Sequence, residues 1–453
     1  MSNNQLNRKL PLIFCILNSV FFILSSCSIQ KQLSKSATRI VLKDSSLRTA
    51  HVGISIFEPT TNKYWYNYQG DHYFVPASNT KIPTCYAAMK YLRDSLVGIS
   101  KMENDTAIFF LPGADPTFLH PDFKNQPVFM YLKNANKKLY TTDIRWKTEA
   151  LGSGWAWNDY NESYMAERSP MPVYGNLIKW IQDKTNNNEP VLIYSVPEVN
   201  WKVDFNITQG NNFFVQRNIG ENVYDISEGK ERLKEQSVPF ATNGIKATLE
   251  LLPDTIHKTI GLLPLPELQK LLLNATLHIN GIKSQPTDSL LKPMMHRSDN
   301  FFAEQTLLMV SNELLGVMNE EKIIDTLLKT DLKDLPQKPR WADGSGLSRY
   351  NLFTPQDFVA IFNKMKNGFG MDRIKNIFPT GNEGTLSNYY KAENGYLFAK
   401  TGTLSGVVSL SGFLYTKKNK LLIFSVLVNN HNSSAMAVRK AVEKFIEGIR
   451  NKY

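Results

Sequence analysis

The pattern of apolar positions is similar at the two ends of the chain. A helical stretch at residues 34–47 precedes two short apolar runs, and two longer apolar runs near the other end precede a helix with one apolar face. Each pair of runs predicts a β-hairpin. The predicted strands are His51–Phe57, Lys63–Tyr68, Val407–Tyr415 and Leu421–Val428, and the last predicted helix covers Ser434–Ile449. We expect both hairpins to share one sheet, so that the chain ends meet in a single α/β domain.

The middle of the chain has a different pattern. From residue 93 to residue 282 the sequence consists of short strand-like pieces rich in Trp, Tyr, Asn and Pro, such as Thr106–Leu111 and Val191–Val196. Helical periodicity returns at Leu290–Leu315. The length of 453 residues also exceeds that of one ordinary domain. The pattern therefore predicts an α/β (α+β) domain, formed by residues 37–92 and 283–453 and split by a β-rich insertion at residues 93–282.

The N-terminal segment is typical of an export signal. Two basic residues precede an apolar run, Leu10–Leu24, which ends in Leu-Ser-Ser followed by Cys27. This order predicts a lipoprotein signal peptide at residues 1–26, lipidation of Cys27 and a polar tether at residues 27–36. An uncleaved signal anchor, or an ordinary signal peptide with an incidental cysteine, is the alternative. This signal predicts an exported protein of the cell envelope or periplasm, held to the membrane by its lipid. No internal apolar stretch is long enough to span a bilayer.

Charge and cysteine content narrow the function classes. The net charge of +11 suits association with anionic wall or membrane material, and an ordinary solvated surface explains it equally well. No basic run with interleaved aromatic residues indicates nucleic acid binding. Because Cys15 lies in the predicted signal and Cys27 is predicted to carry lipid, Cys85 has no disulfide partner, and we expect it to pack in the core. The seven histidines form no metal-ligand motif, so no metal or cofactor is expected.

The first candidate for chemistry is Pro76–Lys81, at the start of a predicted helix. Residues three apart on a helix are neighbours, so Ser78 and Lys81 are expected to touch. A serine hydroxyl becomes a nucleophile when a base removes its proton, and a lysine can be that base when burial and the positive helix N-terminus lower its pKa. The same Ser-x-x-Lys spacing occurs three more times in the chain, where a solvated surface pair is the ordinary interpretation. The spacing alone therefore decides little.

Two further motifs follow along the chain. Ser298–Asn300, with the sequence Ser-Asp-Asn, places a hydroxyl and an amide in a helical region, and Lys400–Thr403, with the sequence Lys-Thr-Gly-Thr, immediately precedes the C-terminal hairpin. On an edge strand the second motif supplies a cation, hydroxyls and a backbone N–H, and its glycine permits close approach of a substrate. A helix cap and a strand-entry turn are the alternative interpretations of the two motifs taken singly. Together with Ser-x-x-Lys, in this order, they form the motif set of penicillin-binding proteins and class A β-lactamases.

Four surrounding blocks make this resemblance more specific. Gly113–Thr117, Gly154–Tyr160, Asp343–Asn351 and Ala399–Leu404 resemble blocks of the class C low-molecular-mass penicillin-binding proteins, the D-Ala-D-Ala carboxypeptidase/endopeptidase family S13. The resemblance spans roughly residue 34 to the C-terminus. It implies a transpeptidase-like, serine β-lactamase-like domain, in which an antiparallel sheet is flanked by helices and the chain is split by a large insertion.

Two residues depart from the family pattern. Pro83 lies two residues after the lysine of the first motif, and we expect it to kink the helix because it removes a backbone hydrogen bond. Asn158 stands in the tryptophan-rich block where the family more often has an aspartate, which weakens any role for a carboxylate there.

The resemblance also implies a role for each motif residue. Ser78 would be the nucleophile, Lys81 its general base and Ser298 a proton relay to the leaving group. The residues implied in substrate binding are Asn300, Lys400, Thr401, Gly402 and Thr403. The backbone N–H groups of Ser78 and Thr403 would form an oxyanion hole. The charge of Lys400 would help to keep Lys81 neutral.

The reaction implied is hydrolysis of peptidoglycan stem peptides that end in D-Ala-D-Ala, through an acyl-enzyme on Ser78, with β-lactam antibiotics as covalent inhibitors. A β-lactamase or esterase on the same fold is one alternative, and a non-catalytic wall-binding lipoprotein is another. The motifs leave open the balance between carboxypeptidase and endopeptidase activity, the diamino acid of the stem peptide, the oligomeric state and the membrane that holds the anchor.

Overall fold

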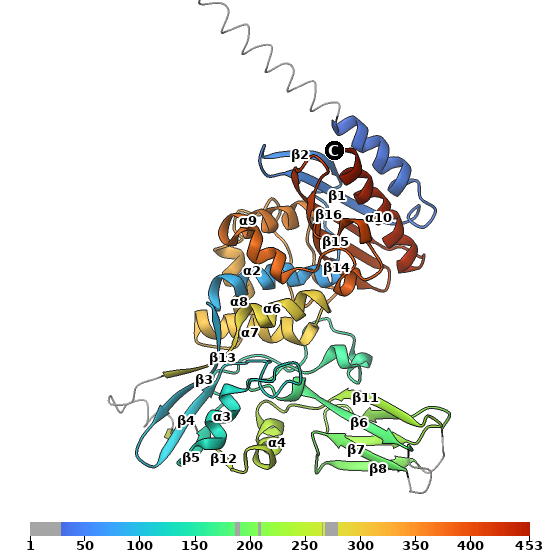
Figure 1. Ribbon diagram of the computed structural model, residues 1–453. Helices are drawn as coiled ribbons and strands as arrows, with labels where there is room; N and C mark the ends of the chain where they lie inside the picture. Colours follow the sequence, from blue (N-terminus) through green and yellow to red (C-terminus); the bar gives the residue numbers. More distant parts are fainter. Residues whose placement is uncertain (1–28, 186–190, 207–209, 265, 268–279) are drawn as a thin grey trace, which may run out of the picture.

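A five-stranded antiparallel sheet joins the two ends of the chain. The computed structural model describes residues 29–185, 191–206, 210–264, 266–267 and 280–453. The strand order in this sheet is β14-β15-β16-β1-β2, and β1 pairs with β16 in register from His51 opposite Asn429 to Phe57 opposite Ile423. The strands are β1 (His51–Glu58), β2 (Lys63–Tyr68), β14 (Leu397–Leu404), β15 (Val407–Tyr415) and β16 (Leu421–Asn429). The expectation that both predicted hairpins share one sheet is confirmed, and so is the predicted fold class (Figure 1).

Helices cover both faces of this sheet because the central strands are apolar on both sides. In β15 and β16, all residues except one at the end of each strand are buried. One apolar cluster joins the sheet to α10 and to the helix at residues 29–42, and a second joins its other face to the remaining helices (Figure 1). The helices of these layers are α2 (Lys81–Tyr91), α6 (Thr287–His296), α7 (Asn300–Leu315), α8 (Glu320–Lys329), α9 (Pro355–Ile377) and α10 (Ala435–Lys452).

The first described helix differs from the expected tether. The chain is helical from residue 29 to residue 42, with a π-helical end at Thr38–Leu42. Leu33, Ala37 and Val41 are buried against the sheet and α10. Their spacing of four residues places them on one helix face. The part of the predicted tether that the structure describes is therefore packed on the domain. The predicted helix at residues 34–47 ends about five residues earlier, at residue 42, and the chain is already helical at residue 29.

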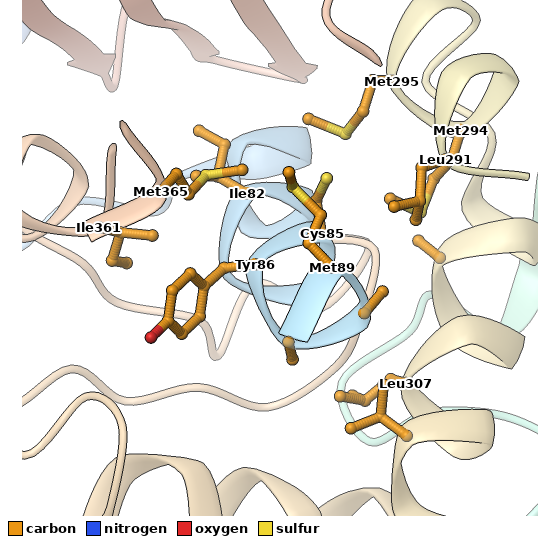
Figure 2. Close-up of a cluster of buried hydrophobic side chains, with 14 of the residues drawn as sticks. Ile82, Cys85, Tyr86, Met89, Leu291, Met294, Met295, Leu307, Ile361 and Met365 are labelled. Carbon is orange, nitrogen blue, oxygen red and sulfur yellow. The ribbon is translucent and has the colours of Figure 1, made fainter. Parts of the chain in front are cut away.

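The helix after the first motif is fixed in the centre of the second apolar cluster. Figure 2 shows α2 end on, with Ile82, Cys85 and Met89 pointing between α6, α7 and α9. Burying such a side chain contributes about 1.5–3 kcal/mol. Cys85 is unpaired and fully buried, as expected for a packing role.

The expected kink at Pro83 is wrong. Pro83 is the third residue of α2, so its missing N–H would have had no intrahelical partner. The irregularity lies just before it instead, where the 3₁₀ turn Ala77–Thr80 changes to α-helix at Lys81.

Among the residues that the structure describes, the region between the two halves of this domain contains three small sheets. A mixed sheet has the order β12-β5-β4-β3-β13, and two three-stranded sheets have the orders β11-β6-β7 and β8-β10-β9 (Figure 1). A separate apolar cluster joins parts of all three sheets to α3 and α4. The elements are β3 (Ser95–Glu103), β4 (Ala107–Pro112), β5 (Lys138–Thr141), β6 (Leu177–Asp183), β7 (Leu192–Val196), β8 (Lys202–Asn206), β9 (Phe214–Arg217), β10 (Val223–Ser227), β11 (Leu233–Pro239), β12 (Ile260–Leu262), β13 (Asn280–Pro286), α3 (Pro127–Asn134) and α4 (Lys246–Ile256). We refer to residues 93–282 as the inserted region.

Candidate active site

Ser78 lies in the 3₁₀ turn that leads into α2. The preceding residue, Ala77, has a φ angle of 48°, in the left-handed region that residues other than glycine rarely adopt. Lys81 begins α2, and its Nζ donates a hydrogen bond of 3.1 Å to Ser78 Oγ. The predicted contact between serine and lysine is therefore present.

Lys81 is completely buried, and its amine is held from three sides. Besides Ser78, Nζ donates to Asn300 Oδ1 at 2.6 Å and to the carbonyl oxygen of Ser345 at 2.8 Å. Burial lowers the pKa of Lys81 to about 8, because removal from water disfavours the charged form. Three carboxylates act in the opposite direction, those of Asp343, Glu304 and Asp299. A lysine with this pKa can accept a proton near neutral pH.

Ser298 and Asn300 lie where α6 ends and α7 begins. Ser298 has a φ angle of 63°, again in the left-handed region. Asp299 caps α7, because its carboxylate accepts the backbone N–H of Phe302 at 2.9 Å. The cap of the helix is thus Asp299, which leaves the flanking hydroxyl and amide for other contacts. Asn300 meets Lys81, and Ser298 Oγ accepts a hydrogen bond of 2.8 Å from Lys400 Nζ.

The third motif lies on β14, which is an edge strand, as predicted. Lys400 is completely buried, and its Nζ also donates to the carbonyl oxygen of Thr401 at 2.7 Å. Burial and the nearby Lys81 hold the pKa of Lys400 well below its usual value. The expected repulsion between the two lysines is therefore present, but its effect falls on Lys400, whereas the pKa of Lys81 is lowered by burial.

The hydroxyl groups of β14 have partners on the opposite face of the strand from Lys400. Thr401 Oγ1 donates to Thr385 Oγ1 at 2.7 Å, and Thr403 Oγ1 accepts a hydrogen bond of 2.6 Å from Arg439 Nη2. Arg439 lies on α10 and is half-buried. The sequence interpretation did not include this cation, because nothing in its local pattern distinguishes it from the other basic residues of the helix.

Gly402 allows β14 to lie close to the turn that carries Ser78. A Cβ atom at this position would lie 2.9 Å from the backbone nitrogen of Ser78 and 2.8 Å from the carbonyl oxygen of Pro76. Both distances are shorter than ordinary contacts, and both atoms belong to the backbone, so any side chain here would separate β14 from the 3₁₀ turn.

A cleft of about 650 Å³ opens beside Ser78. The motif residues that line it are Ser78, Asn300 and Thr403. The inserted region contributes part of the wall with Trp155 and Tyr164. A substrate in this cleft would therefore touch both the split domain and the insertion.

The loop Asp343–Asn351 contributes a backbone contact to the site and is held together by hydrogen bonds to Asp343. The carboxylate of Asp343 accepts backbone N–H groups of Gly346 and Ser348, the side-chain amide of Asn351 and the indole N–H of Trp155. Sequence comparison identified this block, but it gave no role to its backbone, which supplies the Ser345 carbonyl to Lys81.

Two site predictions concern other chemistry. Within the ranges that the structure describes, no group of three or more histidine, cysteine, aspartate or glutamate side chains could hold a metal ion. Cys27, the predicted lipidation site, lies outside the described residues.

The fold and the site together define a serine acyl hydrolase of the penicillin-recognising class. Ser78, which contacts Lys81, and Thr403 on an edge strand line one cleft, and a second serine-lysine contact joins that strand to the turn between α6 and α7. The chain matches the D-Ala-D-Ala carboxypeptidase 3 (S13) family over residues 33–449. It belongs to this family, and it is therefore a serine peptidase.

Individual relatives are similar along most of the chain. A D-alanyl-D-alanine carboxypeptidase of Actinomadura sp. (strain R39) is 23% identical, covering 89% of this chain and 82% of that protein. The D-alanyl-D-alanine carboxypeptidase DacB of Haemophilus influenzae is 22% identical, covering 89% and 90%. The crystal structure of penicillin-binding protein 4 (dacB) from H. influenzae has a TM-score of 0.69 at 19% identity, covering 92% and 99% of the two chains, and its complex with a β-lactam has a TM-score of 0.66.

Proposed function

We propose that this protein hydrolyses peptidoglycan stem peptides that end in D-Ala-D-Ala, with Ser78 as the nucleophile. The observation that carries the proposal is the contact between Lys81 and Ser78, because it joins a serine hydroxyl to a buried amine whose pKa is lowered to about 8. At neutral pH and above, a useful fraction of such an amine is neutral and can take the serine proton.

The acylation step follows from this pair. Ser78 Oγ attacks the carbonyl carbon of the penultimate D-alanine, and its proton passes to Lys81 Nζ. When the C–N bond breaks, the proton held by Lys81 passes through the hydroxyl of Ser298 to the departing D-alanine nitrogen, which leaves Lys81 neutral for the next step. Water then hydrolyses the ester, and its proton returns through the same lysine. Each proton that leaves an oxygen is thereby delivered to the leaving amine or back to Ser78.

The edge strand β14, which forms one wall of the cleft, is suited to binding the end of the substrate peptide. Lys400, Thr401 and Thr403 would recognise the terminal carboxylate, and Asn300 would hold a stem-peptide amide. The backbone N–H groups of Ser78 and Thr403 would stabilise the oxyanion, a contribution of about 10²- to 10³-fold for one donor. Gly402 supports this arrangement because it allows the strand to approach Ser78 N. A β-lactam resembles the same peptide end, and the H. influenzae protein was crystallised with one.

The direct test replaces Ser78 with alanine. Ser78→Ala should abolish both D-alanine release and covalent labelling by a fluorescent penicillin, since no other atom would carry the acyl group. Labelling is measured on a denaturing gel, and circular dichroism checks that the variant is folded. Labelling that persists in the folded variant would reject the assignment.

We also propose that both reactions of the family are open to this site. Carboxypeptidase and endopeptidase reactions share the acyl donor and differ only in the amine that leaves. Digestion of purified peptidoglycan followed by mass spectrometry separates free D-alanine from the loss of crosslinked dimers. A β-lactamase on this fold would instead release hydrolysed penicillin rapidly, and no persistent adduct would form.

We propose that the protein is an exported lipoprotein anchored through Cys27. Residue 29, two positions after this cysteine, already belongs to the helix that packs against α10, and two residues span at most about 7 Å. Such an anchor would hold the face formed by this helix and α10 close to the membrane. None of the described helices has the length and apolar character needed to cross a bilayer. Mass spectrometry of the intact protein should find diacylglycerol on Cys27, and Cys27→Ala should move the protein out of the membrane fraction.

A further inference from the structure

Glu304 is a buried carboxylate that is connected to the amine of Lys81 by two hydrogen bonds, both made by the backbone of Ser345. It lies on α7, is 1% exposed, and its Oε1 accepts the backbone N–H of Ser345 at 2.7 Å. The carbonyl oxygen of the same Ser345 accepts the hydrogen bond from Lys81 Nζ at 2.8 Å. One residue therefore connects the carboxylate to the lysine through its N–H on one side and its C=O on the other.

The other side of Glu304 faces a cation from the inserted region. Arg168 is completely buried, and its Nη1 lies 3.4 Å from Glu304 Oε2. Its Nη2 contacts Glu320 Oε1 at 3.0 Å and donates to the carbonyl oxygens of Glu149 and Leu151 at 2.9 and 3.1 Å. Removing one partner of a buried ion pair costs about 3–5 kcal/mol, because it leaves the other charge without compensation. These contacts attach the inserted region to α7 beside the active site.

The loop that carries Ser345 fits closely between α7 and the nucleophile turn. A Cβ atom on Gly344 would lie 2.8 Å from the carbonyl oxygen of Ala303, and one on Gly346 would lie 2.0 Å from that of Ala77. Gly346 also has a φ angle of 88°. Because both neighbours are backbone atoms, the loop has little room to move independently of α7. A shift of Glu304 would thus be passed to the Ser345 carbonyl.

We propose that Glu304 is a positioning residue that holds Lys81 in place through the backbone N–H and C=O of Ser345. Through its contact with Arg168, Glu304 also connects the catalytic amine to the inserted region. This inference rests on the proposed function, in which Lys81 is the general base. The mechanism gives Glu304 no contact with substrate, so its effect is indirect. It acts on Lys81 in two ways, by fixing the position of the amine and by placing a negative charge near it.

The charge effect has a definite sign. The carboxylate of Glu304 raises the pKa of Lys81, together with Asp343 and Asp299, against the larger effect of burial. Lys400 is a further ionisable group near Lys81, and its own charged form is disfavoured by burial and by Lys81. Burial raises the pKa of Glu304 to about 7; the nearby Asp343 also raises it, and Arg168 lowers it. Glu304 is therefore mainly charged above about pH 7, and loss of that charge should lower the pKa of Lys81 in the range where this lysine titrates.

The experiment measures the rate constant for acylation by a fluorescent penicillin between pH 5.5 and 9.5. In the wild type the rate should fall as the pH decreases below about 8, because Lys81 becomes protonated. Glu304→Gln keeps an oxygen for the Ser345 N–H but removes the charge. We expect the acid limb of its profile to move to lower pH, on the order of one unit.

A second variant separates position from charge. Glu304→Asp keeps the charge but shortens the side chain by one methylene, which moves the carboxylate away from Ser345. The plateau of the acylation rate at high pH should therefore fall about tenfold or more. The acid limb of the pH profile should stay within about 0.3 unit of the wild type. If this variant retains the wild-type plateau, the positioning role is rejected. If the acid limb of Glu304→Gln coincides with that of the wild type, the electrostatic role is rejected.

Glu320 provides the matched control. Its carboxylate also binds Arg168, but it is not among the charges that act on Lys81. Glu320→Gln should lower the midpoint of thermal unfolding without moving the acid limb. A purely structural network would instead give similar profiles for the glutamine variants at 304 and 320. If the wild type shows no Ser78-dependent labelling, the proposed function itself is rejected. That result differs from failure of this inference, in which the wild type is labelled but the Glu304 variants do not behave as expected.

Discussion

Two buried lysines adjoin the cleft, and their surroundings differ: Lys81 on α2 contacts residues of the helical wall, and Lys400 lies on β14, which forms the strand wall. On the helical wall, the amine of Lys81 contacts Ser78 Oγ and two oxygens of neighbouring segments, and three carboxylates raise its pKa against the larger effect of burial. On the strand wall, the amine of Lys400 contacts Ser298 and the carbonyl oxygen of the next residue, and burial and the charge of Lys81 both lower its pKa. Burial therefore lowers the pKa of both amines, but neighbouring carboxylates oppose this effect at Lys81, whereas the charge of Lys81 adds to it at Lys400.

This difference suggests how the pair works with a substrate. Two buried amines with like charges disfavour the state in which both are protonated, so their titrations are coupled. A substrate carboxylate beside Lys400 would raise the pKa of that lysine, because an opposite charge stabilises its ammonium form. The resulting charge would in turn lower the pKa of Lys81. Binding of the peptide end would thus favour the neutral form of Lys81, the proposed base.

The largest effect should follow from removing the amine on the helical wall. Lys81→Met keeps most of the side-chain volume but leaves Ser78 without a base, so the acylation rate should fall by about 10²- to 10⁴-fold. Stopped-flow measurement of penicillin labelling gives the rate constant, and thermal unfolding shows whether the variant is folded. A folded variant that is acylated at the wild-type rate would show that another group, Lys400 being the nearest amine, activates the serine.

A smaller and more selective effect is expected on the strand wall. Lys400→Met should lower kcat/KM for a peptide ending in D-Ala-D-Ala by about 10- to 100-fold, since a hydrogen bond to a charged group contributes about 1.5–3 kcal/mol. The control is the same peptide with an amidated C-terminus, which has no carboxylate to bind. Equal losses for both peptides would contradict carboxylate recognition and would assign Lys400 to the chemical step.

The sequence predicted the parts of this arrangement that depend on local pattern. The apolar runs of Val407–Tyr415 and Leu421–Val428 indicated strands, because alternate or continuous apolar residues define strand faces directly. The spacing of Ser78 and Lys81 indicated a contact, since helical geometry fixes it. The position of Lys400 before a hairpin indicated an edge strand. The order of the motifs and the resemblance to a family then placed these elements in one domain.

The contacts that the sequence did not predict join distant segments. Arg168 and Glu304 are 136 residues apart, and neither has a local pattern that distinguishes it from a surface charge. The carbonyl oxygen of Ser345 carries no side-chain signal at all, although it binds Lys81. The helix at residues 29–42 did have a signal, because Leu33, Ala37 and Val41 recur every four residues, but polar neighbours favoured interpretation of its first part as a tether.

The smallest effect concerns the second cation of the strand wall. Arg439 is half-buried on α10 and donates to Thr403 Oγ1, so its contribution should resemble that of a partly solvated contact, about 0.5–1 kcal/mol. Arg439→Ala should therefore raise KM for the carboxylate peptide by about two- to five-fold and leave the acid limb of the acylation profile unchanged. Lys440→Ala, one residue further along the helix and exposed, is the control. A KM increase of more than tenfold would mean that the substrate carboxylate binds mainly to Arg439. In that case Arg439 would bind the carboxylate on the strand side of the cleft, and Lys400 would have another role.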